Sequence, residues 1–121
     1  MKKILIIEDD KFIQQIFVDK FGDNKKAQLY TADTGAQGYE KAIEVAPDII
    51  LLDLILPDQN GLEVLKKLRK NKVTKNAEIM IVTNVGFQDK IEEAKKLGSS
   101  DYFVKTNDHF LSIIDMLKTY L

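Results

Sequence analysis

The feature that most restricts the fold of this chain is a series of short apolar runs, each long enough for one strand and followed by a segment of helical periodicity. The runs cover residues 4–7, 49–52, 79–82 and 102–104, with a weaker one at 29–32. The three strongest are continuous, whereas a half-buried strand would alternate apolar and polar residues. Continuous runs are typical of strands buried on both faces, and they predict a parallel sheet covered by helices.

The segments between the runs carry apolar residues at the spacing of one helix face. Such faces lie at residues 12–17, 39–46, 62–68, 91–97 and 110–117. A strand followed by a helix, repeated in this way, requires right-handed crossovers and predicts a three-layer α/β fold. The expected helix boundaries are the N-caps Thr34, Asn60 and Asp108, a start at about Gly61, and ends at Pro47 and Gly98.

The length of the chain bounds its organisation. At roughly 150 residues per domain, 121 residues predict one domain that spans residues 1–121, without a fused output module. The N-terminus is too quickly acidic for a signal peptide, and no run approaches the ~18 apolar residues of a membrane span. These features predict a cytoplasmic protein that does not enter a membrane.

Charge and residue types exclude several kinds of site. Lys and Arg number 18 and Asp and Glu number 19, so a net charge of −1 offers no general attraction for nucleic acid. We interpret a basic stretch at 66–75 as the solvated end of a helix, where cations complement the helix dipole. The chain has no cysteine and only one histidine, His109, so any metal must be held by oxygen ligands.

Polar side chains follow the apolar runs, at the edge where parallel α/β sheets bind ligands. They are Glu8, Asp9 and Asp10 after the first run, Asp53, Thr83 and Asn84 farther along, and Lys105 after the last run. Asp9 and Asp53 would repel each other unless a hard divalent cation neutralised them, and Mg²⁺ suits such ligands. We expect a site where one carboxylate attacks phosphorus while Lys105 and Thr83 bind phosphoryl oxygens. Asp10 is expected to cap a helix.

The same residues stand in longer motifs: Glu8-Asp9 after KILII, Asp53 in IILLDLILPDQNGLEVL, Thr83 in IMIVTN, and Lys105 in SSDYFVKT. With them, the whole chain resembles a receiver domain of the two-component response regulators, close to the single-domain chemotaxis-type form. The resemblance implies a flavodoxin-like, doubly wound parallel sheet of five strands in the order 2-1-3-4-5, with five helices. In that order the first and third strands are adjacent, so that Asp9 and Asp53 meet at the topological switch point.

The resemblance also implies how the acidic residues divide their roles. Asp53 is the phospho-acceptor. The cofactor is Mg²⁺, which binds Asp9 and Asp53 directly, Glu8 through a water molecule, and the backbone carbonyl of Ile55. Members of the family catalyse much of the phosphoryl transfer themselves and hydrolyse the product slowly, so they are phospho-acceptors and not enzymes with a separate substrate.

The remaining implied roles concern switching and partners. Thr83 and Lys105 bind the phosphoryl group, and Tyr102 turns inward when the threonine is drawn toward it. The donor is a sensor histidine kinase or a histidine phosphotransfer protein. We expect a monomer or a phosphorylation-dependent dimer that binds a downstream protein, without binding nucleic acid directly.

Several positions bear on how far the family pattern holds. Thr106 stands where the family has a proline after a cis peptide; a cis bond before a non-proline residue costs ~2.5 to 4 kcal/mol, so we expect a trans, differently shaped loop. Asn84 replaces the usual Ala or Gly and adds bulk at the mouth of the site. Ile55 and Val85 occupy positions that border the approach of hydrolytic water in the family, and their apolar side chains predict slow loss of the phosphoryl group.

Three other functions are alternatives. If Asn84 and Thr106 mark decay of the switching parts, the chain is a pseudo-receiver, a constitutive protein interaction scaffold; retention of the acidic and phosphoryl-binding residues argues against this. Phosphatases with an aspartyl-phosphate intermediate place an acid two residues after the nucleophile, but here that residue is Ile55, which cannot donate a proton. A flavin-binding domain is disfavoured because no Gly-, Ser- or Thr-rich loop follows the first strand.

Overall fold

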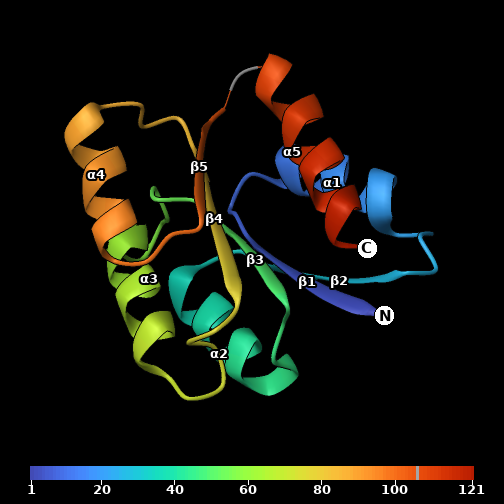
Figure 1. The fold of residues 1–121 in the computed structure, drawn as a ribbon, viewed down its shortest axis with the longest axis horizontal. Coiled ribbons are helices and arrows are strands. Elements are labelled where there is room, and N and C mark those ends of the chain that lie inside the picture. The colour runs from blue at the N-terminus through green and yellow to red at the C-terminus, as the bar shows by residue number, and fades with distance from the viewer. Residues whose placement is uncertain (106) are drawn as a thin grey trace.

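The computed structural model describes residues 1–105 and 107–121, and in this part of the chain strands alternate with helices (Figure 1). The strands are β1 (Lys2–Ile7), β2 (Ala27–Ala32), β3 (Ile49–Leu52), β4 (Glu78–Thr83) and β5 (Asp101–Val104). The helices are α1 (Lys11–Phe21), α2 (Gly35–Val45), α3 (Gly61–Lys70), α4 (Gln88–Lys96) and α5 (Asn107–Tyr120). Each predicted apolar run lies within a strand, so the predicted order is confirmed. None of these helices has the length and apolar character needed to cross a membrane.

The sheet is parallel throughout and has the order β2-β1-β3-β4-β5 that the resemblance implied. β1 lies between β2 and β3, with Ile7 opposite both Ala32 and Leu52. The N–H of Asp53 donates to the carbonyl of Ile7 at 3.1 Å, which extends this pairing past the end of β3. The residues that follow β1 and β3 therefore lie side by side.

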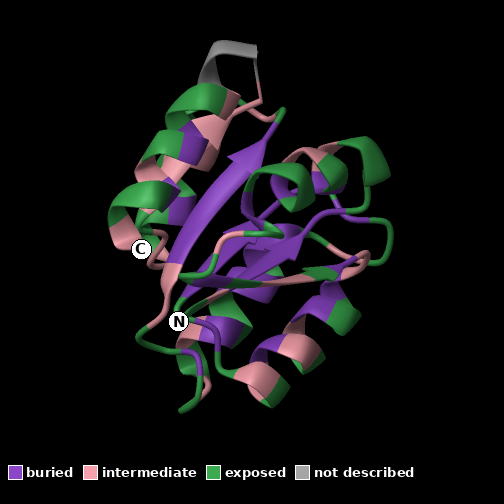
Figure 2. Cartoon of the chain, turned by 90° about the vertical axis from the view of Figure 1, so that its right-hand side faces the viewer, coloured by how far each residue is buried: buried purple, intermediate pink, exposed green. Residues whose placement is uncertain are grey.

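Helices cover both faces of the sheet, and the strands are accordingly the most buried part of the chain (Figures 1 and 2). Along β1, Leu5 and Ile7 belong to one core with α2, α3 and α4, whereas Ile4 and Ile6 belong to the other with α1 and α5. All four side chains are at most 2% exposed. The continuous apolar run thus contributes to two cores at once, as its lack of alternation predicted.

The N-termini of the helices follow the expected capping chemistry. The side chain of Asn60 accepts a hydrogen bond from the N–H of Leu62 at 2.9 Å, and α3 begins at Gly61 as predicted. Thr34 caps α2 in the same way. These oxygens satisfy N–H groups that have no partner inside the helix. The third expected cap, Asp108, is wrong, because α5 begins at Asn107 and Asp108 therefore lies within the helix.

The C-termini of α2 and α4 use left-handed residues. Gly98, which follows α4, has a φ of 101°, as the sequence predicted for a glycine at that place. The end of α2 comes slightly before Pro47, because Ala46 takes the left-handed conformation with a φ of 52°. Proline is therefore not the residue that ends this helix.

The interpretation of residues 66–75 as a solvated basic stretch is wrong for Arg69. Its guanidinium group donates to three backbone carbonyls, those of Gly98 at 2.8 Å, Lys75 at 2.9 Å and Ala77 at 2.6 Å. The planar fork of arginine can bind several acceptors at once, which a flexible ammonium group does less well. Arg69 therefore ties α3 to the segments that lead into β4 and β5.

Candidate functional site

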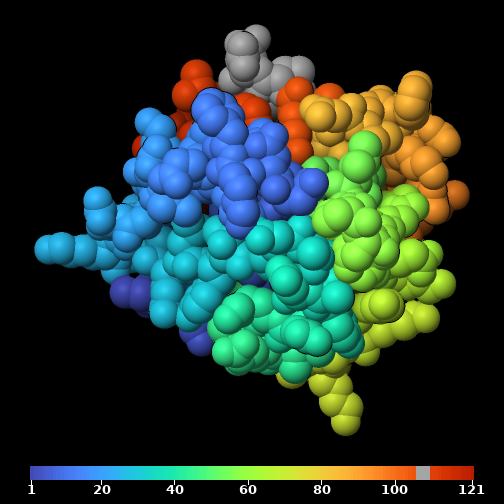
Figure 3. All heavy atoms as spheres, turned by 180° about the vertical axis from the view of Figure 1, so that it is seen from behind, coloured from blue at the N-terminus to red at the C-terminus, as the bar shows by residue number. Residues whose placement is uncertain are grey.

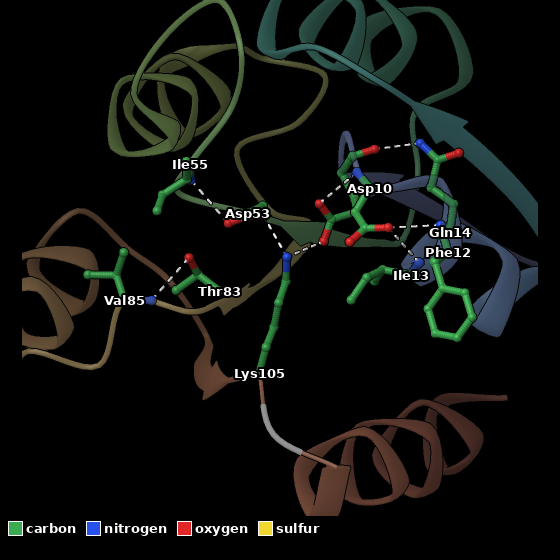
Figure 4. A network of polar contacts seen from close by, with 10 residues as sticks. Asp10, Phe12, Ile13, Gln14, Asp53, Ile55, Thr83, Val85 and Lys105 are labelled. Atoms are coloured by element: carbon green, nitrogen blue, oxygen red, sulfur yellow. Dashed lines mark hydrogen bonds and ion pairs between the residues drawn. The ribbon is translucent and has the colours of Figure 1, made fainter.

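The ends of four strands bring polar side chains to one edge of the sheet (Figure 4). Glu8 follows β1, Asp53 follows β3, Thr83 is the last residue of β4, and Lys105 follows β5. Parallel strands point their carboxyl ends the same way, so residues far apart in the sequence meet there. The structure brings these predicted residues together.

Lys105 lies between two buried carboxylates. Its Nζ is 2.7 Å from Oδ2 of Asp53 and also forms a short ion pair with Oε1 of Glu8. The three side chains are almost fully buried, at 8% exposure for Lys105, 6% for Asp53 and 4% for Glu8. The other Asp53 oxygen, Oδ1, accepts a hydrogen bond from the N–H of Ile55 at 3.0 Å. Both oxygens of Asp53 are thus engaged.

This geometry changes the acidity of the groups around Lys105. Burial raises the pKa of Glu8 to about 7, and the charge of Asp53 adds to the effect, while the hydrogen bond from Lys105 opposes it. Burial by itself would lower the pKa of Lys105, but its hydrogen bonds to the two carboxylates outweigh that effect and raise it. Lys105 therefore stays an ammonium ion between the side chains of Glu8 and Asp53.

Three acidic residues can share one cation. Glu8, Asp9 and Asp53 each offer a carboxylate oxygen, and the three oxygens lie within 4.8 Å of one another. Asp9 is exposed, so that a cation can reach it from solvent, while its two neighbours in the cluster are buried. A set of carboxylate oxygens fits a hard divalent cation such as Mg²⁺. Asp10 stays apart from the cluster, because its carboxylate caps α1 as predicted.

The loop after Asp53 borders this cluster. The side chain of Ile55, whose carbonyl is the remaining expected ligand, is 59% exposed. Ile55 and Val85 both line an open groove of about 450 Å³ between the β3–α3 loop and the start of α4. Asn84 is exposed next to Val85, as its predicted place at the mouth of the site requires. Thr106, where a trans and differently shaped loop was predicted, lies outside the described residues.

Thr83 and Tyr102 are linked through the backbone at Val85. The fully buried Thr83 accepts a hydrogen bond at Oγ1 from the N–H of Val85 at 3.5 Å. The hydroxyl of Tyr102 donates to the carbonyl of the same residue. Its ring is half-buried against the core on the α2, α3 and α4 side, and burial raises the pKa of its hydroxyl. Both residues thus contact the loop that leads into α4.

Two supports of the β3–α3 loop were missed by the sequence analysis. The carboxylate of Asp58 accepts hydrogen bonds from the N–H groups of Gly35 at 2.8 Å and Ala36 at 2.9 Å, which lowers its pKa to about 2. Gly61 packs against Asp53 so closely that an added Cβ would lie 2.2 Å from the backbone oxygen of Asp53. The sequence analysis placed the start of a helix at Gly61, but the close approach of Gly61 to Asp53 is visible only in the folded structure.

Gln14 is a third residue that the sequence analysis missed. It is 6% exposed, and its side-chain Nε2 donates to the carbonyl of Glu8 at 2.5 Å and to Oδ1 of Asp33 at 2.8 Å. A spacing signal was present, because Gln14 is followed at helical intervals by the buried Phe17 and Phe21. That spacing places a glutamine on the buried stripe of α1.

Comparison with known proteins agrees with this geometry. The family model of the response regulator receiver domain matches residues 4–115. The chain is 32% identical over 120 residues to sporulation initiation phosphotransferase F of Bacillus subtilis, covering 99% of this chain and 94% of that protein. It is 31% identical over 104 residues to the chemotaxis protein CheY of Thermotoga maritima, covering 86% and 85%. The crystal structure of chemotaxis protein CheY4 of Vibrio cholerae matches with a TM-score of 0.86 at 26% identity, covering 100% of this chain and 99% of that one.

Proposed function

The chain belongs to the family of response regulator receiver domains, and from that premise we propose that it is a phosphorylation switch. In this proposal, Asp53 accepts a phosphoryl group from a sensor histidine kinase or a histidine phosphotransfer protein. The added charge, about −1.5 to −2, then changes the surface that a downstream protein recognises. Residues 1–121 act as one receiver domain in the cytoplasm, as a monomer or as a phosphorylation-dependent dimer.

One observation carries the proposal: the buried carboxylate of Asp53 is paired with the buried ammonium of Lys105 beside two further carboxylates. An aspartate that only formed a turn would lie at the surface and would need no such partner. Burying a carboxylate costs free energy unless it is paired, so this arrangement needs a reason beyond packing. A nucleophile that must carry a phosphoryl group supplies that reason, because the ammonium is already in place to bind the new charge.

The acidic cluster supports Mg²⁺ as the cofactor. We expect Asp9 and Asp53 to bind it directly, Glu8 to bind it through a water molecule, and the carbonyl of Ile55 to provide a further ligand. When bound, Mg²⁺ supplies positive charge that stabilises the phosphoryl oxygens during transfer. The protein's part is to keep Asp9 and Asp53 together against their mutual repulsion.

The transfer itself is an in-line displacement at phosphorus. An oxygen of Asp53 forms the new bond to phosphorus as the bond to the donor's imidazole nitrogen breaks, and that nitrogen keeps the electron pair. Nζ of Lys105, which is 2.7 Å from Oδ2 of Asp53, then binds a phosphoryl oxygen. The hydroxyl of Thr83 donates to a second one. Slow hydrolysis restores Asp53, so the chain is an acceptor that promotes its own phosphorylation and dephosphorylation.

The test is intact-mass measurement after incubation with Mg²⁺ and a small acyl phosphate. Wild type should gain one phosphoryl group, and Asp53→Asn should gain none because the amide is not a nucleophile. Asp10→Ser is the matched control, since serine keeps the helix cap and leaves the acidic cluster intact. Incorporation that persists in Asp53→Asn would place the acceptor elsewhere. A wild type that binds Mg²⁺ yet never gains mass would favour the pseudo-receiver.

A further inference from the structure

The geometry points to Gln14 as a positioning residue for Mg²⁺ binding: its side chain and backbone together hold the turn that carries Asp9. Gln14 lies on α1 and belongs to none of the groups expected to contact the cation. The inference rests on the proposed Mg²⁺ site and deepens it, because it says what keeps the exposed ligand in place.

Gln14 donates hydrogen bonds on both sides of Asp9. Its side-chain Nε2 donates to the carbonyl of Glu8 at 2.5 Å, and its backbone N–H donates to the carbonyl of Asp10 at 3.0 Å. Figure 4 shows the Gln14 side chain reaching back from α1 toward this turn. The carbonyl groups of the two residues that flank Asp9 are therefore both bound by Gln14, although Asp9 itself is exposed.

Asp33 fixes the direction of the Gln14 amide. The second hydrogen of Nε2 goes to Oδ1 of Asp33 at 2.8 Å. The Glu8 carbonyl and the Asp33 carboxylate are acceptors only, so a reversed amide would place an oxygen against two oxygens. Asp33 also accepts a hydrogen bond from Nζ of Lys11 at 2.6 Å, and the hydrogen bonds from Lys11 and Gln14 lower its pKa, which keeps it anionic. Asp33 lies between β2 and α2, and Figure 3 shows α1 next to the segment that contains these two elements.

A buried polar side chain can also serve stability alone, and the two roles predict different measurements. If Gln14 only satisfied buried hydrogen bonds, its loss would lower the free energy of unfolding and leave the Mg²⁺ affinity of the folded protein unchanged. If it positions Asp9, the affinity itself falls. Groups that orient metal ligands from outside the coordination sphere change affinity by roughly 10–100-fold. Gln14 acts through the backbone and not on the carboxylate, so we expect the lower end, about tenfold.

The experiment is calorimetric titration of Mg²⁺ into Gln14→Met and into Gln15→Met as the matched control. Methionine keeps the length of the side chain and removes its hydrogen bonds. Gln15 is the next residue of α1, is exposed, and donates to Asp19 at 2.7 Å, so the control loses an amide of the same kind. We expect Gln14→Met to raise the dissociation constant about tenfold and Gln15→Met to leave it unchanged. Urea unfolding without Mg²⁺ records any stability loss separately.

Equal dissociation constants in the two variants would overturn the inference. If Gln14→Met does not fold, Asp33→Ala replaces it, because Asp33 is near the surface and its removal releases the side-chain amide of Gln14. The dissociation constant of Asp33→Ala for Mg²⁺ should rise at least about twofold. No rise would overturn the inference as well. Failure of the proposed site looks different. In that case wild type itself would show no Mg²⁺ binding, or Asp9→Asn would bind Mg²⁺ as wild type does.

Discussion

The close contact between Gly61 and Asp53 predicts that Gly61→Ala lowers both the stability of the chain and the rate of its phosphorylation. The new Cβ would lie 2.2 Å from the backbone oxygen of Asp53 and 2.6 Å from the Cα of Leu54, whereas ordinary contacts of a Cβ begin at 3.4 Å. Both neighbours are backbone atoms, so no side chain can rotate away. The strand end that carries Asp53 must therefore move by about 1 Å relative to α3.

That movement should reduce stability and slow the proposed phosphorylation. Overpacking of this kind typically costs about 1–3 kcal/mol, and about 0.4–1 kcal/mol is recovered because alanine restricts the unfolded chain. We expect Gly61→Ala to be destabilised by about 1–2 kcal/mol. A displacement near 1 Å at a reacting group can slow a reaction about 100-fold, so Asp53 should gain its phosphoryl group much more slowly.

Gly86→Ala is the matched control, because its Cβ would meet only the side chain of Val104, at 3.3 Å. Urea unfolding gives the stability of both variants, and an intact-mass time course at fixed Mg²⁺ and acyl phosphate gives the rate. The control should stay within about 0.5 kcal/mol of wild type. If Gly61→Ala is as stable and as reactive as Gly86→Ala, the contact does not constrain Asp53 and the reasoning fails.

Three further predictions follow from burial and hydrogen bonding. Glu8 has a pKa raised from 4.5 to about 7 in the folded state, so its contribution to stability is complete below pH ~4.5 and is lost as the pH rises through about 7. In urea unfolding with EDTA, the stability of wild type relative to Glu8→Gln should fall by up to about 3 kcal/mol between pH 4.5 and 8; a pH-independent difference would contradict this. Ile55→Asn and Val85→Glu should each shorten the life of the phosphorylated state, measured as phosphate release, because polar side chains can orient water; loss that is equal or slower in both would show that apolar walls are not the cause. Arg69→Lys should destabilise the chain by about 2 kcal/mol in urea unfolding, and the exposed Lys70→Met should have little effect; equal effects would mean that the three carbonyl contacts contribute nothing.

The arrangement of the site could be predicted because it depends on simple rules. Continuous apolar runs mark strands buried on both faces, and the ends of parallel strands meet at one edge. Those two rules predict that Asp53, Thr83 and Lys105 come together. The strand order and the individual roles came from the resemblance to a known family, and the roles of these residues stay predictions until phosphorylation is measured.

The supports of the site could not be predicted in the same way. Gln14, Asp58 and Arg69 have backbone atoms as partners, and every residue offers the same carbonyl and N–H groups, so the sequence contains no complementary signal for such pairs. The basic composition around Arg69 even indicated a solvated side chain, whereas its guanidinium group binds backbone carbonyls. Likewise, the sequence predicted that Lys105 would lie near Asp53, but only the structure shows it shared with Glu8.

The position of β1 in the middle of the sheet has a consequence for how the chain folds during synthesis. β1 pairs with β2 on one edge and with β3 on the other, and β3 begins only at Ile49. Until the ribosome has released that segment, one edge of β1 exposes apolar residues and unpaired backbone groups, which favour aggregation. A fragment that ends before β3 should therefore need a chaperone or a complementary fragment to stay in solution, even though it contains two complete strand–helix units.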